Sequence, residues 1–225
     1  MVGESKELFY VHKDILCEIS PFIRAALAGG FREAEDQEIP FPEDDVETFE
    51  RLVQWVYTRA LNLSSYETEA ETEAHYLALA RLFVLADKLQ IPMLKTLTVL
   101  TMYESVDKAK WVPPLEVIGH VYANSHRRCG LRRLLVDSYI WRLDYEWYDT
   151  DTTVDTLLPV DEFTAELAVG LAQRISHPER LDPFRDGIDE AMAASAYYDQ
   201  DQIEDFKDQA VEQTVADKSG GGNDI

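Results

Sequence analysis

Residues 9–22 read FYVHKDILCEISPF, and the pattern of apolar residues changes within this stretch. Residues 8–11 are a run of aromatic and branched side chains that is typical of a β-strand. The apolar residues that follow take a helical spacing. Ser20 and Pro21 form a helix start, because a serine hydroxyl caps free amides and a proline at the first position lacks an N–H. The stretch therefore predicts a strand that turns into a helix, and a second helix that ends at Gly29.

The same stretch contains side chains that enzymes use. A cysteine–histidine pair would need His12 and Cys17 to meet, and Cys17 to lie in an electropositive and accessible place. The neighbours of Cys17 are apolar instead. We therefore predict that Cys17 is a small core residue and that His12 forms a structural hydrogen bond where the strand meets the helix. No catalytic residue is predicted, and the chain is not expected to be an enzyme.

Outward from this stretch the sequence predicts a short second strand and then helices. Residues 38–41 favour a strand, and a helix follows Pro42 with acidic residues at its positive end. Residues 74–90 are apolar nearly all round, which favours burial between other elements. Further helical patterns occur at about 92–106, 114–126, 130–147, 161–175 and 199–215, before a tail at 217–225 that is expected to be flexible.

The overall charge excludes several classes of partner. The 225 residues include 43 acidic and 21 basic side chains, which gives a formal net charge of −22. Nucleic acids and anionic membranes require a basic surface, so neither is an expected partner. Two cysteines form no disulfide framework, which favours the cytosol or the nucleus. No apolar run approaches the ~20 residues of a membrane helix.

Two patterns were considered as metal sites and rejected. His126 and Cys129 have a usable spacing, but with His120 they supply only three ligands, and no second pair completes four. The sequence DTDTTVD at 149–155 begins like a calcium-binding loop. It has Val154 where the loop needs glycine, and it lacks the final glutamate. No metal and no cofactor is predicted.

The basic residues gather in one place, the sequence HRRCGLRRL. A nucleic-acid surface would need exposed aromatic residues among them and a basic overall field, and neither is present. Two interpretations remain for these arginines. They pair with carboxylates of the same chain, or they contact an acidic protein partner. The residues concerned are Arg127, Arg128, Arg132 and Arg133.

The order of motifs over residues 2–105 resembles a BTB (POZ) domain, specifically the fungal type. The matching motifs, in order, are F-x-V-H-K, S-P-F, G-x-F-x-E, P-E-D-D, W-x-Y-T, A-D-K and I-P-x-L. The residues that carry the resemblance are Val11, His12, Lys13, Ser20, Pro21, Phe22, Trp55, Tyr57 and Asp87.

The resemblance implies an α+β fold that is predominantly helical: a small sheet flanked by helices, followed by an all-α C-terminal extension. The expected domains are 1–107 for the BTB domain and 108–216 for the helical extension, with the tail at 217–225. The core is expected to include Val11, Ile15, Leu16, Phe22, Phe49, Val53, Trp55, Tyr57, Leu82, Val84 and Leu85.

The resemblance also implies a function in protein–protein interaction. Many BTB domains bind a cullin of the cullin-3 class and serve as substrate adaptors for ubiquitination, using a hydrophobic-x-Glu element. Phe31-Arg32-Glu33 stands at the matching position. Two interpretations of this element are open: an aromatic anchor with an orienting carboxylate, or a packing phenylalanine beside a solvated charge.

The resemblance implies a cullin or a second copy of the chain as the partner. The N-terminal elements that BTB homodimers exchange are missing from residues 1–8, so the oligomeric state is left open. The alternative function is a non-catalytic scaffold or a transcription-related regulator. Such a protein self-associates or binds another protein without ubiquitination.

Overall fold

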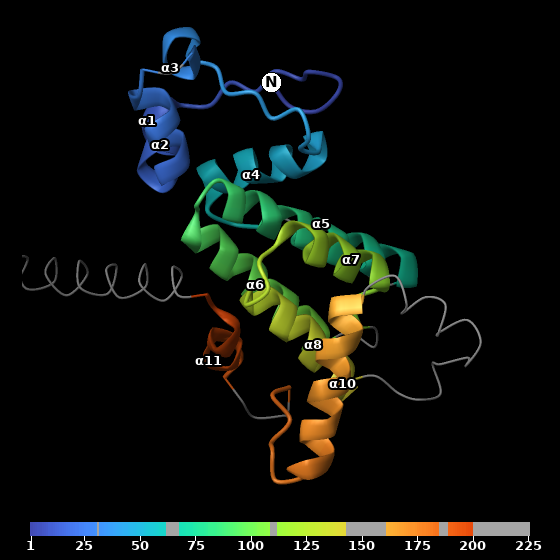
Figure 1. Cartoon of the computed structure of the whole chain (residues 1–225). Helices are drawn as coiled ribbons and strands as arrows, with labels where there is room; N and C mark the ends of the chain where they lie inside the picture. Colours follow the sequence, from blue (N-terminus) through green and yellow to red (C-terminus); the bar gives the residue numbers. More distant parts are fainter. Residues whose placement is uncertain (31, 62–67, 109–111, 143–160, 185–188, 200–225) are drawn as a thin grey trace, which may run out of the picture.

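The computed structural model describes the chain except residues 31, 62–67, 109–111, 143–160, 185–188 and 200–225. The described residues are predominantly helical. Their elements are α1 (Lys13–Ile19), α2 (Pro21–Ala28), α3 (Arg32–Asp36), α4 (Val46–Thr58), α5 (Glu69–Lys88), α6 (Pro92–Lys108), α7 (Leu115–Asn124), α8 (Gly130–Arg142), α10 (Asp161–Ser176), α11 (Glu190–Ala194) and the 3-10 helix η2 (Ser195–Tyr197). Figure 1 shows α5 and α6 in the middle, with α1 to α4 on one side and α8 and α10 on the other.

The first two helices confirm the corner predicted at Ser20. α1 ends at Ile19, and α2 begins at Pro21 with Ser20 as its N-cap. The Ser20 hydroxyl accepts a hydrogen bond from the Ile23 amide at 3.1 Å and donates one to the Leu89 carbonyl oxygen at 2.5 Å. Ser20 is fully buried. Its side chain both caps the start of α2 and joins α2 to Leu89, the residue that follows α5.

Ser20→Ala is expected to lower the free energy of unfolding by about 2 kcal/mol, because it removes a helix cap and leaves a buried carbonyl group unpaired. Urea denaturation followed by circular dichroism measures the change. Ser176→Ala, at an exposed position, is the matched control and should shift stability by less than about 0.5 kcal/mol. Equal effects of the two substitutions would contradict the role of Ser20.

α4 begins where the acidic residues predict it. Asp45 is the N-cap, and its carboxylate accepts hydrogen bonds from the Thr48 amide at 2.9 Å and the Thr48 hydroxyl at 2.8 Å. Partial burial acts to raise the pKa of Asp45. The hydrogen bonds and the nearby arginines outweigh burial and hold the pKa below its usual range. The buried apolar side chains of this helix are Phe49, Leu52, Trp55 and Val56.

α5 is buried on two sides, as its apolar composition predicts. One side joins a C-terminal core through Tyr76, Leu79, Ala80 and Phe83. The other side joins an N-terminal core through Leu82, Leu85 and Ala86. Among the described helices, none is both long enough and apolar enough to cross a membrane.

The C-terminal core connects the two halves of the chain. α6 contributes Val99, Met102 and Tyr103 to it, although α6 follows directly on the N-terminal helices. The helices after residue 113 pack on these same side chains. They contribute Val117, Ile118, Val121, Leu131, Leu134, Leu135, Phe163 and Leu167. The helices beyond residue 107 therefore complete the burial of α5 and α6 rather than standing apart.

The last described residues fold back onto α6 and α8, and we call Glu190–Asp199 the clamp segment. Tyr197 is buried, and its hydroxyl donates to Asp137 at 3.0 Å. The Asp199 carboxylate accepts a hydrogen bond from the Gly130 amide at 2.6 Å, at the start of α8. A second Asp199 oxygen lies 3.3 Å from the ammonium of Lys95. The clamp segment thus joins α8 to α6.

The predicted small sheet is not confirmed. In the part of the chain that the structure describes, residues 8–11 and 38–41 form no strands. Two isolated bridges occur instead, from Val2 antiparallel to Glu7 and from Val2 parallel to Phe41. Each pairing extends over a single bridge, so neither grows into a ladder. The local sequence favours extended backbone here, but a strand also needs a partner along its whole length.

The predicted core is correct in part. Phe49, Trp55, Leu82 and Leu85 are buried, and Val11, Ile15, Leu16, Phe22, Val53 and Val84 are half-buried. The assignment of Tyr57 to the core was wrong, because 46% of its surface is exposed. The physical reason is its hydroxyl, which hydrogen-bonds to His12 at the surface.

Several predicted elements lie outside the described residues. The predicted helix at 130–147 is described as far as Arg142. The calcium-like sequence at 149–155, the helix at 199–215 beyond Asp199 and the tail at 217–225 fall in ranges that the structure does not describe. The predictions at 114–126 and 161–175 are confirmed by α7 and α10.

Candidate protein-interaction surface

The predicted contact element lies at the start of α3. Phe31 is outside the described residues. Arg32 is exposed, and its Nε lies 3.2 Å from the Asp36 carboxylate one turn later. Glu33 is half-buried. A hollow of about 290 Å³ opens beside these side chains, and its lining includes Met1, Arg32, Glu33, Asp36, Glu38 and Pro40.

Lys13 fixes the position of α3. Its ammonium donates a hydrogen bond to the Gln37 side-chain oxygen at 2.9 Å. Gln37 follows α3 in the left-handed conformation, with φ of 54°, and its side-chain amide donates to the Ala34 carbonyl oxygen at 2.5 Å. Lys13 is the first residue of α1, so this contact ties α1 to the end of α3. Lys13, which carries the family resemblance, thus contacts the residue that follows the helix of Arg32 and Glu33.

His12 has the structural role that the sequence predicts. Its backbone amide donates to the Tyr57 hydroxyl at 3.1 Å, and its Nδ1 lies 2.7 Å from the same oxygen. The two rings also meet edge to face. Among the described residues, no hydrogen bond joins His12 to Cys17. His12 therefore joins the start of α1 to α4, and Cys17 is half-buried against the N-terminal core.

A hydroxyl–imidazole pair that the sequence analysis missed lies in the C-terminal core. His75 Nε2 is 2.8 Å from the Ser105 hydroxyl, which donates to the Thr101 carbonyl oxygen. His75 and Ser105 are both buried. Burial lowers the pKa of His75 to about 4. The buried imidazole joins α5 to α6 through this contact, and only the packing of the two helices could have revealed it.

The lowered pKa of His75 predicts acid sensitivity. The unfolded chain takes up a proton near pH 6.5, but the folded chain resists it until about pH 4, so stability falls as the pH falls between these values. Between pH 7 and pH 5, we expect the free energy of unfolding of the unsubstituted chain to drop by about 2 kcal/mol more than that of the His75→Gln variant. Urea titrations at both pH values measure this. His177→Gln, at an exposed histidine, should leave the drop unchanged.

The residues considered as metal ligands do not form a site. Cys129 is buried, and burial raises the pKa of its thiol. His126 lies 3.8 Å from Asp199. Over the residues that the structure describes, no three histidine, cysteine or acidic side chains are placed to hold a metal ion. Cys129 packs in the C-terminal core, as its apolar neighbours indicate.

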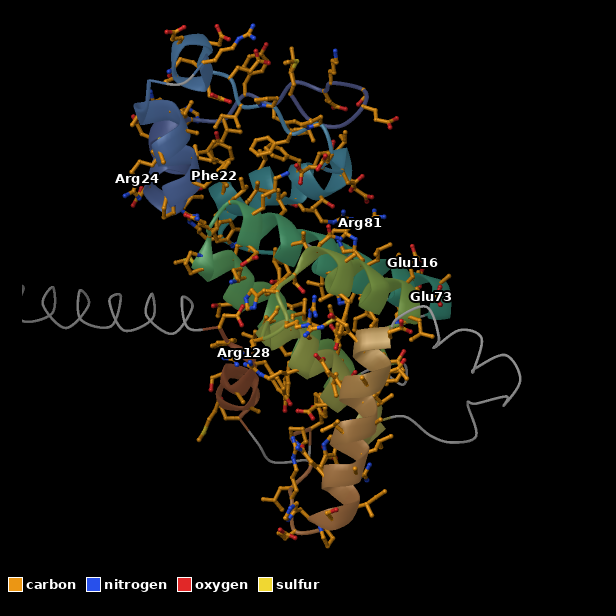
Figure 2. The ribbon with its side chains drawn as sticks, in the orientation of Figure 1. Phe22, Arg24, Glu73, Arg81, Glu116 and Arg128 are labelled. Carbon is orange, nitrogen blue, oxygen red and sulfur yellow. The ribbon has the colours of Figure 1, made fainter. Side chains whose placement is uncertain are left out.

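The arginines near α8 bond mostly within the chain. Arg127 and Arg132 both contact Glu162, at 2.7 and 2.8 Å. Arg133 donates to the carbonyl oxygens of Arg128 and Ala196. Arg128 itself is exposed, near α11 in Figure 2. Pairing with the chain's own carboxylates is therefore confirmed for Arg127 and Arg132, and Arg132 is buried.

Comparison with known proteins gives one match. The family model described as BTB/POZ domain matches residues 1–105. No curated protein and no solved structure gives a significant match. The matched range ends within α6 and includes the corner at Ser20, the His12–Tyr57 contact and α3. We call residues 1–105 the BTB region, and the family that it matches is a class of domains that mediate protein–protein interaction.

Proposed function

We propose that the chain is a protein-interaction adaptor that binds a cullin of the cullin-3 class. The BTB/POZ match over residues 1–105 carries this proposal. The placement of Arg32 and Glu33 supports it, because α3 lies at the surface and is fixed to α1 through Lys13. In this role the chain places a bound substrate near a ubiquitin-conjugating enzyme.

The proposed contact uses Phe31, Arg32 and Glu33 together. An aromatic side chain that leaves water on binding contributes most of the energy at such a contact, and a nearby carboxylate fixes the orientation. Glu33 is half-buried and lines the hollow at α3. Its carboxylate is therefore available to a partner that binds at this hollow. Arg32 is already held by Asp36, so we assign it a supporting role.

Substitution of Phe31 and Glu33 together by alanine is expected to weaken cullin binding by roughly a hundredfold, because both the anchor and the orienting charge are lost. Isothermal titration of the full chain with a cullin-3-type N-terminal region measures this. Glu35→Ala is the matched control, since Glu35 is an exposed acidic residue of the same helix. Unchanged affinity in the double variant would rule out this contact.

The helices beyond the BTB region belong to the same proposal. We propose that the BTB domain spans residues 1–107 and is of the fungal type, and that the helical extension spans residues 108–216. We also propose that the protein is located in the cytosol or the nucleus. In this proposal the helical extension recruits the substrate or supports the cullin. Its packing on α5 and α6 supports a fixed orientation relative to α3.

A further inference from the structure

An apolar groove lies between α8 and α10, beyond the BTB region. It has a volume of about 420 Å³ and is open to solvent. The two helices pack closely beside it, since a Cβ at Gly170 of α10 would lie 2.3 Å from Cδ1 of Ile140 of α8. Grooves with an apolar lining hold side chains of a ligand or of another peptide segment.

The lining of the groove has a buried part and an exposed part. Val136 and Ile140 of α8 line it and are buried. Ala165 and Val169 of α10 also line it, one helical turn apart, and both are exposed. For Val169 the exposed fraction is 58%. Exposed apolar side chains along a groove mark an interaction surface.

The clamp segment brings the chain to one end of this groove. Its Ala196 carbonyl oxygen accepts a hydrogen bond from Arg133 at 3.3 Å, and its Tyr197 hydroxyl donates to Asp137 at 3.0 Å. Arg133 and Asp137 both line the groove. Asp199 accepts a hydrogen bond from the amide of the first residue of α8, which lies about 5 Å along the helix before Arg133. The residues after Asp199 therefore begin about one helical turn from the groove.

The residues that follow Asp199 have a sequence that suits an apolar groove. Within residues 200–216, Ile203, Phe206 and Ala210 recur at i, i+3 and i+7, which is the spacing of one side of a helix. The same stretch contains five acidic residues and one lysine. The sequence therefore predicts a helix with an apolar side and an acidic side, within reach of the groove.

The charges at the groove favour an acidic segment. Among the described residues, the charged side chains of the lining are Arg133, Asp137, Glu166 and Arg180. Asp137 pairs with Arg180 at 3.4 Å, and Glu166 accepts a hydrogen bond from a tyrosine hydroxyl. The lining has no net charge, in a chain with a formal net charge of −22, so an acidic segment meets less repulsion here than over most of the surface. Arg128, exposed near α11 in Figure 2, adds positive charge beside the clamp segment.

A tethered segment needs only a weak contact to fill the groove. A short flexible connection gives the attached segment an effective concentration of roughly 1 mM. At that concentration, a contact with a dissociation constant of roughly 100 μM is occupied about ten times as often as it is empty. A second copy of the chain or another protein has to compete with this local concentration.

We propose that residues 200–216 fold back as a helix and occupy the groove between α8 and α10. The side formed by Ile203, Phe206 and Ala210 covers the apolar lining. The acidic residues then lie toward solvent and toward Arg133 at the rim. This site lies on the helical extension, so the proposal holds whether or not a cullin binds at α3.

The test measures how fast a thiol placed in the groove reacts in the full chain. Val169→Cys supplies the thiol, and its reaction with an aromatic disulfide reagent is followed by absorbance. Adding Ile203→Asp and Phe206→Asp should raise the rate constant about tenfold, because the segment then no longer covers the groove. Val215→Asp with Ala216→Asp adds the same charges on the other side of the helix and should change the rate by less than about twofold. The unsubstituted chain gives the background from its two cysteines, of which one is buried and one half-buried.

A peptide supplies the segment separately. Residues 200–216 as a synthetic peptide, added to the variant with Ile203→Asp and Phe206→Asp, should slow the reaction again, with half of the effect at roughly 100 μM. Equal rates for Val169→Cys with and without the two aspartates would overturn the proposal, as would a peptide without effect at roughly 1 mM. A rate that falls as the protein concentration rises would assign the groove to a second copy of the chain instead.

Discussion

Lys95→Met is expected to lower the free energy of unfolding by about 3 kcal/mol. Only 2% of the Lys95 side chain is exposed, and its ammonium lies 2.8 Å from Asp87 and 3.3 Å from Asp199. Asp199 is itself buried. Removal of the ammonium takes away the positive charge that lies 3.3 Å from that buried carboxylate, and loss of a compensating charge in a buried pair is costly. Urea denaturation measures the loss.

A second variant separates the lost charge pair from lost packing. Lys95→Met combined with Asp199→Asn removes both charges, and an asparagine oxygen still accepts from the Gly130 amide. This double variant should regain at least about half of the loss. Lys6→Met, at an exposed lysine, should change stability by less than about 0.5 kcal/mol. A double variant no more stable than Lys95→Met alone would show that the pair does not explain the effect.

Gly130→Ala should destabilise the chain by about 3 kcal/mol, although alanine favours helix over glycine. A Cβ at Gly130 would lie 1.6 Å from the Tyr197 carbonyl oxygen and 2.6 Å from its carbon. These are backbone atoms of the clamp segment, so the overlap with the added Cβ is relieved only if the segment moves away from α8. Thermal unfolding gives the stability, and limited proteolysis reports whether residues 190–199 have become accessible.

Gly119→Ala is the matched control, because Gly119 is also in a helix and a Cβ there would meet nothing within 4 Å. Helix propensity alone then applies, and this variant should be more stable by about 1 kcal/mol. The two substitutions are therefore expected to have opposite signs. A stabilising Gly130→Ala would contradict the close packing of the clamp segment on α8.

The helices were predictable because their signals are local. Ser20 and Pro21 start α2, and acidic residues mark the start of α4. The nearly all-round apolar composition of residues 74–90 predicts burial on two sides, and two cores meet at α5. Each of these features depends on residues within a few positions along the chain.

The features that sequence missed depend on distant residues. The predicted sheet needed a partner along the whole length of residues 8–11 and 38–41. In the described part of the chain only single bridges form, from Val2 to Glu7 and from Val2 to Phe41. Tyr57 has an apolar ring, but its exposure follows from a hydroxyl contact with a residue 45 positions away. The clamp segment has no helical periodicity of its own, and its burial follows from α6 and α8.

The candidate contact was predicted from the motif order alone. The G-x-F-x-E motif predicts Arg32 and Glu33 just after Gly29, and the structure places them on α3, with Arg32 exposed and Glu33 half-buried. The short α3 was not predicted, because five residues carry too little periodicity. The link from Lys13 to Gln37 that positions α3 joins residues 24 positions apart and has no sequence signal.

The binding of a cullin-3-type N-terminal region to the full chain tests the central claim most directly. Isothermal titration should show saturable one-to-one binding, with a dissociation constant of about 1 μM or tighter. Circular dichroism should confirm that both proteins are folded under the same conditions. Absence of binding at roughly 100 μM of each folded protein would contradict the adaptor function.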